Sequence, residues 1–73
     1  MNQKKSFIIG HPAYTGANRF QATSSFIGAY SILKARGIPT MLIAGNLRYA
    51  MEGHFVTISN RDFEVIELRY DVA

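Results

Sequence analysis

Cysteine and tryptophan are absent from this chain of 73 residues, and proline occurs only twice. Without cysteine there are no disulfide bonds and no thiolate ligands for a metal, so neither can stabilise the fold. The first apolar run, Phe7–Ile9, is far shorter than a signal-peptide core or a membrane span. We therefore expect a cytoplasmic protein, of a cell or of a virus inside one, whose small core gains stability by association.

Charge of either sign is sparse and scattered. Eight Lys and Arg residues against five Asp and Glu residues give a formal charge of +3. Beyond the N-terminal lysines, the basic residues are dispersed along the chain: Arg19, Lys34, Arg36, Arg48, Arg61 and Arg69. A nucleic-acid-binding face usually needs clustered basic residues. We expect a protein or peptide as substrate or partner, a second copy of the chain as a further candidate, and no membrane. A nucleic-acid binder is a third, less favoured alternative.

The chain length predicts one small domain over residues 1–73, with residues 1–5 frayed. Phe7–Ile9 is predicted as a short strand, closed by Gly10 and Pro12. His11–Gln21 has no clear period and is predicted as a loop. Loops of this length in small domains are often functional.

The clearest element is a helix that starts between Ala22 and Ser25 and ends at Arg36. Its apolar residues recur at helical spacing and predict the face that packs into the sheet: Ala22, Phe26, Ala29, Tyr30 and Leu33. Residues 23–25 are all suitable N-cap types. Gly37 is a suitable left-handed residue after the helix, and Pro39 prevents the helix from continuing.

The rest of the sequence is predicted to form strands joined by short turns. Thr40–Ala44 and Leu47–Met51 flank a Gly45-Asn46 turn, and His54–Ser59 and Phe63–Val72 flank a turn at residues 60–62. Short turns require antiparallel pairing. The predicted fold class is α+β, with one long buried helix packed on a small antiparallel sheet of three to five strands.

A His and an acid stand at matching strand ends. His54 opens one predicted strand and Asp71 closes the next. The antiparallel register that sets Ser59 opposite Ile66 also sets His54 opposite Asp71, as neighbours across the ladder. An acid beside a His can orient it as a base for a nucleophile, and a helix N-terminus favours an anionic nucleophile. A solvated Asp and a structural His remain the alternatives.

Residues 24–56, with Asp71, resemble the core of the transglutaminase-like and papain-like cysteine peptidases. In that group a Cys begins a helix that ends in Gly-Ile-Pro, as at Gly37-Ile38-Pro39. A His then starts a strand before an aromatic residue, as at His54-Phe55, and an Asp ends the next strand, as at Asp71. The resemblance implies that the nucleophile would stand at Ala22, where alanine is either engineered or the mark of a pseudoenzyme.

The resemblance implies a miniature domain for amide-bond cleavage or acyl transfer, inactive as written and enzymatic only if position 22 is natively Cys. Tyr14, Phe20 and Gln21 would line its substrate site. No cofactor is expected, and no metal, because His11 and His54 have no evident third ligand. The alternative is a non-enzymatic α+β binding protein, such as a phage-type inhibitor or accessory factor that docks on a larger protein.

Overall fold

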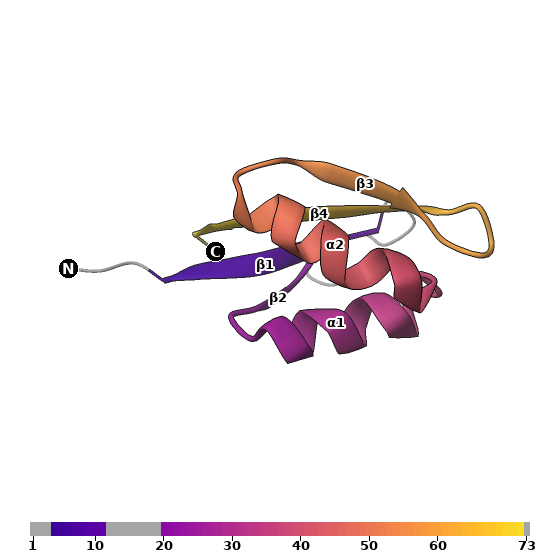
Figure 1. Cartoon of the computed structure of the whole chain (residues 1–73), viewed down its shortest axis with the longest axis horizontal. Helices are drawn as coiled ribbons and strands as arrows, with labels where there is room; N and C mark the ends of the chain where they lie inside the picture. Colours follow the sequence, from indigo (N-terminus) through magenta and orange to yellow (C-terminus); the bar gives the residue numbers. More distant parts are fainter. Residues whose placement is uncertain (1–3, 12–19, 73) are drawn as a thin grey trace.

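The computed structural model describes residues 4–11 and 20–72, which form two helices packed on one four-stranded antiparallel sheet. The sheet order is β2-β1-β4-β3, with β2 and β3 at the edges. Figure 1 shows the sheet with both helices on the same side. The elements are β1 (Lys5–Gly10), β2 (Phe20–Thr23), α1 (Phe26–Ala35), α2 (Thr40–Met51), β3 (Val56–Ser59) and β4 (Val65–Val72). The predicted α+β class with an antiparallel sheet is confirmed, although the prediction had one helix.

Strand alternation divides the sheet into a helix face and an open face. On the helix face, the central strands contribute fully buried side chains such as Phe7 and Ile9 of β1 and Leu68 of β4. The residues between them, such as Ile8 and Arg69, point to the other side. Neither helix covers that side, which we call the open face.

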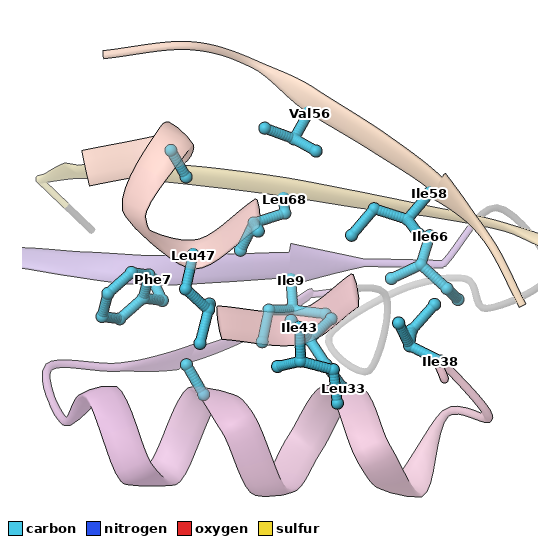
Figure 2. Packing of buried hydrophobic residues seen from close by; sticks show 12 residues of the cluster. Phe7, Ile9, Leu33, Ile38, Ile43, Leu47, Val56, Ile58, Ile66 and Leu68 are labelled. Atoms are coloured by element: carbon cyan, nitrogen blue, oxygen red, sulfur yellow. The ribbon is translucent and has the colours of Figure 1, made fainter. Parts of the chain in front are cut away.

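The core lies between the helix face and the two helices. Figure 2 shows aliphatic side chains from both helices meeting those of the strands. The largest side chains with almost no exposure are Phe7, Ile9, Leu33, Ile43, Leu47, Ile66 and Leu68. All are apolar, so the hydrophobic effect is the main force that holds the layers together.

Helix α1 has the predicted inward face and end, but it is not the buried helix that was predicted: only Ala29 and Leu33 are buried, and Ile27 is 78% exposed. Ser25 is its N-cap, and the Ser25 hydroxyl accepts a hydrogen bond from the Gly28 N–H at 3.0 Å. Of the predicted inward face, Ala29 and Leu33 are fully buried, and Phe26 and Tyr30 are partly buried against the core. The helix begins at Phe26, one residue after the predicted range of starting positions.

The C-terminus of α1 is closed by a glycine with a positive φ. Gly37 has φ +84°, and its N–H donates to the Lys34 carbonyl, while the Ile38 N–H donates to the Leu33 carbonyl. This is the Schellman arrangement that the Gly37-Ile38-Pro39 run predicts.

Helix α2 corrects the prediction of two strands at Thr40–Ala44 and Leu47–Met51. Residues 40–51 form one helix, and its buried positions Ile43, Leu47 and Ala50 are spaced by four and three residues. Gly45 lies on the exposed side, and Asn46 donates its side-chain amide to the Leu42 carbonyl. The Gly-Asn pair was interpreted as a turn, but burial of a helical stripe outweighs the low helix propensity of two residues.

The strand boundaries also differ from the prediction. The first strand and the hairpin of β3 and β4 are confirmed, with β3 starting two residues later than predicted and β4 also two residues later. Strand β2 was missed: Phe20 and Gln21 were assigned to the loop, and Ala22 and Thr23 to the region where the helix starts, although the four residues alternate apolar and polar. No helix in the described part of the chain is both long and apolar enough to cross a membrane.

Candidate functional site

Ala22 does not lie at the helix N-terminus, where the predicted nucleophile would stand. It lies in β2, opposite Ile8 of β1, and is exposed. Helix α1 begins only at Phe26, after the Ser25 cap. The unpaired N–H groups and the dipole of that helix therefore act at Ser25 rather than at Ala22.

His54 lies between α2 and β3, on the helix side of the molecule. Its ring stacks on Tyr49 of α2, with centroids 3.9 Å apart and planes 6° apart. Its Nε2 is 3.9 Å from a Glu52 carboxylate oxygen. The partners of His54 thus come from the end of α2 and not from β4.

Asp71 lies on β4, opposite Ser6 of β1. It is exposed and shares the open face with Arg69, two residues before it. Its carboxylate accepts a hydrogen bond from the N–H of the next residue, Val72, at 2.7 Å.

The hairpin register keeps His54 and Asp71 apart. Val56 pairs with Leu68, which is one residue away from the predicted register, so the position opposite Asp71 is not His54. A shift of one residue exchanges the two faces of a strand. Among residues 4–11 and 20–72, no ion pair joins the two side chains, and no three His, Asp or Glu residues form a group that could hold a metal ion.

The predicted substrate-binding residues lie in different places. Tyr14 falls outside the described residues. Phe20 lines a shallow pocket of about 120 Å³ on the open face, together with Ile8, Phe55 and Arg69. The Gln21 side-chain carbonyl accepts a hydrogen bond from the Arg36 guanidinium, which joins β2 to the end of α1.

The Phe20 ring also explains the glycine opposite it. A Cβ on Gly10 would lie 2.6 Å from the Phe20 ring, so the ring would have to move to admit a side chain at this position. The ring therefore lies close to the β1 backbone at Gly10, and Ile8, which lines the same pocket as the ring, is 7% exposed.

A polar cluster at the turn of the β3–β4 hairpin is organised by buried Asn60. Its side-chain amide donates to the Arg36 carbonyl at 2.8 Å and to a Glu64 carboxylate oxygen at 3.1 Å. Its side-chain carbonyl accepts the N–H groups of Asp62 and Glu64, both at 2.9 Å. Three of these four hydrogen bonds order the hairpin loop itself, and the bond to Arg36 joins the loop to the end of α1. The Arg61 N–H adds a bond to the Gly37 carbonyl at 3.2 Å.

Buried His11 completes this cluster. Its Nε2 lies 3.1 Å from the Glu64 carboxylate, and its side chain is 6% exposed. Hydrogen bonds from Asn60 and then His11 hold the pKa of the Glu64 carboxyl below its usual range, against a smaller opposing effect of burial. A polar pocket of about 210 Å³ opens beside these residues, with Arg36 on its wall.

Phe63 projects from the tip of the same hairpin. The Asn60 N–H donates to the Glu64 carbonyl, and the Phe63 N–H donates to the Asn60 carbonyl, which makes a tight turn followed by a left-handed residue. That residue is Phe63, with φ +62°. Glycine is the usual residue at such a position. The Phe63 side chain is 90% exposed, the largest exposure of any large apolar residue in the described part of the chain.

Sequence reasoning found the turn at residues 60–62 but neither Asn60 nor Phe63 as special residues. Asn at the start of a turn is a signal for side-chain bonding to the following backbone N–H groups. No sequence signal marks a phenylalanine in the left-handed region. His11 was assigned to a loop, and its contact with Glu64 was missed because the two residues are distant in sequence.

Comparison of the chain with models of known protein families, with curated proteins and with solved structures finds no match. The resemblance to the transglutaminase-like group stays a prediction from the residues that carry it.

Proposed function

We propose that this chain is a non-catalytic binding domain that docks on another protein by inserting Phe63 into an apolar pocket of that partner. The observation that carries the proposal is the combination of strain and exposure at Phe63. A left-handed backbone costs a residue with a Cβ about 1–2 kcal/mol, and the exposed ring gains little from burial in return. Strained residues of this kind concentrate at functional sites.

The support beneath Phe63 suits an anchor. Three side-chain hydrogen bonds of Asn60 order the loop from within, and its bond to Arg36 and the bond from Arg61 to Gly37 tie the loop to the end of α1. A loop that is already ordered loses little conformational entropy on binding. Phenylalanine has only two side-chain torsions, so the ordering of its ring on binding is also inexpensive.

The charges around the tip favour a protein partner over nucleic acid. Arg61 contributes one positive charge, and the exposed Asp62 and Glu64 contribute two negative charges. Phosphate backbones are bound by surfaces with an excess of positive charge. An exposed aromatic side chain near an arginine is instead typical of protein–protein interfaces, in which aromatic residues and Arg are enriched.

The experiment is a capture assay with two variants that separate binding from stability. The chain and its Phe63→Ala and Phe63→Gly variants are immobilised and exposed to a lysate of the cells that naturally make the chain. Captured proteins are identified by mass spectrometry. We expect at least one protein that binds the natural chain and is lost from both variants, followed by direct titration of that purified protein. Loss of an anchor of this kind typically weakens binding about 30-fold or more.

The matched control is Phe55→Ala, which removes an exposed aromatic ring from the open face and leaves the hairpin tip unchanged. It should retain the partner. If the Phe63 variants capture the same proteins as the natural chain with equal affinity, Phe63 is not an anchor and the proposal is wrong.

The acyl-transfer expectation has a separate test in Ala22→Cys. Because Ala22 lies on a strand and His54 stacks on α2, we expect an ordinary thiol, with a pKa near 8.5. The pH dependence of alkylation by iodoacetamide measures it. A thiol pKa depressed by about two units or more, and restored by His54→Ala, would favour the cysteine-peptidase reading over the binding domain.

A further inference from the structure

Among the strands that the structure describes, β3 is an edge strand that has a partner on one side only. It lies at the end of the sheet order β2-β1-β4-β3, and that partner is β4. The stretch from Phe55 to Ser59 carries no charge and no proline. Charged residues and prolines are common means by which edge strands avoid pairing with other chains. β3 is short, but it has neither of these protections.

The hairpin hydrogen bonds determine which backbone groups of β3 face outward. The Asn60 N–H donates to the Glu64 carbonyl, so this pair is a hydrogen-bonded pair of the ladder. Hydrogen-bonded pairs alternate along an antiparallel ladder, so Ile58 and Val56 also bond toward β4. The N–H and C=O groups of Phe55, Thr57 and Ser59 therefore point away from the sheet.

We infer that β3 pairs with β3 of a second copy of this chain, antiparallel, with Thr57 opposite Thr57 across a two-fold axis. In this register Phe55 lies opposite Ser59 of the second copy, and Ser59 lies opposite Phe55 of the second copy. All three pairs are outward-facing, and each can exchange two N–H···O bonds, giving six. A two-fold axis perpendicular to the sheet keeps each open face on the same side, so the pairing makes one continuous sheet.

The side chains match in the same register. On the helix face, Val56 of one copy lies opposite Ile58 of the other, and both are apolar. On the open face, two threonines face each other, a pair that stabilises antiparallel ladders. Helix α2 adds apolar surface beside this edge: the stacking of Tyr49 on His54 places Tyr49 toward β3, and Leu42, two turns earlier, shares that side. Tyr49 is 49% exposed and Leu42 is 41% exposed, so both have surface left to bury.

This inference does not rest on the docking role of Phe63. The pairing uses the edge of β3, whereas Phe63 lies beyond it in the hairpin loop. A chain that dimerises but captures no partner would contradict only the proposed function, and a monomer that binds a partner through Phe63 would contradict only the pairing.

The first experiment uses the absence of cysteine in the chain. Because the described residues include no cysteine, Thr57→Cys introduces a single thiol in each copy. In the proposed dimer the two thiols face each other across the axis, at a Cα separation of about 5.5 Å, which a disulfide can bridge. Ser59→Cys is the matched control: its two copies are offset by four residues, roughly 13 Å along the strand. Under mild oxidation of the folded protein we expect rapid, nearly complete cross-linking of the Thr57→Cys variant and at least about tenfold slower cross-linking of the Ser59→Cys variant. Equal rates, or no cross-linking of the Thr57→Cys variant, would overturn the proposed register.

The second experiment reverses the charge at the axis. Sedimentation equilibrium of the natural chain should show a dimer at millimolar concentration. Thr57→Lys and Thr57→Glu should each be monomeric, because like charges face each other, and an equal mixture of the two should recover the dimer. Circular dichroism checks that each variant is folded, as expected for an exposed edge position. A natural chain that stays monomeric, or a mixture that does not dimerise, contradicts the pairing.

Discussion

Replacing Phe63 by glycine should stabilise this protein, although it removes the larger side chain. Phe63 has φ +62°, in the left-handed region, where a Cβ costs about 1–2 kcal/mol. Glycine avoids that cost but loses about 0.5–1 kcal/mol through its greater freedom in the unfolded chain. The ring is 90% exposed, so its removal sacrifices little burial. The difference between these two ranges is a gain of about 0–1.5 kcal/mol in the free energy of unfolding, and its midpoint is about 0.75 kcal/mol.

In a domain of this size, 1 kcal/mol corresponds to a change in Tm of roughly 4–8 °C, so the midpoint predicts that Phe63→Gly raises Tm by about 3–6 °C. Thermal unfolding followed by circular dichroism measures the shift. Phe63→Ala is the matched control, since it removes the ring but keeps the Cβ and the strain, and its Tm should stay close to that of the natural chain. If the glycine variant is no more stable than the alanine variant, the backbone at position 63 stores no strain, and the argument for a functional Phe63 loses its basis.

Three further predictions are tested by urea unfolding. Leu33→Ala should lower the free energy of unfolding by about 2–5 kcal/mol because Leu33 is fully buried, whereas Ile27→Ala on the exposed side of the same helix should change it by less than about 0.5 kcal/mol; equal effects would mean that the helix face is misassigned. Gly10→Ala should lower the free energy of unfolding by roughly 1–3 kcal/mol because its Cβ would meet the Phe20 ring. When Phe20→Ala is already present, Gly10→Ala should lower it by much less. If the effect of Gly10→Ala is the same with and without the Phe20 ring, the backbone conformation is its cause instead. Hydrogen bonds hold the pKa of Glu64 below its unfolded value of about 4.3, so its stabilising contribution is complete above that pH and is lost as the pH falls through the lower folded pKa. The natural chain should accordingly exceed Glu64→Gln in stability at neutral pH, and a difference that stays constant into acid would rule out this linkage.

The elements that could be predicted from the sequence are those whose signals are local. Helix α1 has a serine cap, an apolar stripe and a glycine at its end within a short stretch of chain, and each appears in the structure in its expected role. The hairpin of β3 and β4 was likewise found from a polar turn between two apolar runs. In these cases local propensity and tertiary packing favour the same conformation.

The errors arose where local signals and packing disagree, or where one residue of register matters. In α2, Gly45 and Asn46 suggest a turn, but the burial of Ile43 and Leu47 against the sheet stabilises a continuous helix. The predicted approach of His54 to Asp71 depended on a register one residue away from the observed pairing. A strand has a period of two, so that single residue moves side chains to the opposite face.

By itself, the amino-acid sequence determined an α+β domain without disulfides, a capped amphipathic helix and a terminal hairpin, since these follow from composition and from contacts a few residues apart. Only the tertiary structure decided which distant residues meet: His11 with Glu64, Asn60 with the end of α1, and His54 with α2. It also decided the strain at Phe63 and the edge position of β3 among the described strands. The physical reason is that contacts distant in sequence depend on how the layers pack and which register the strands adopt, which no local pattern encodes.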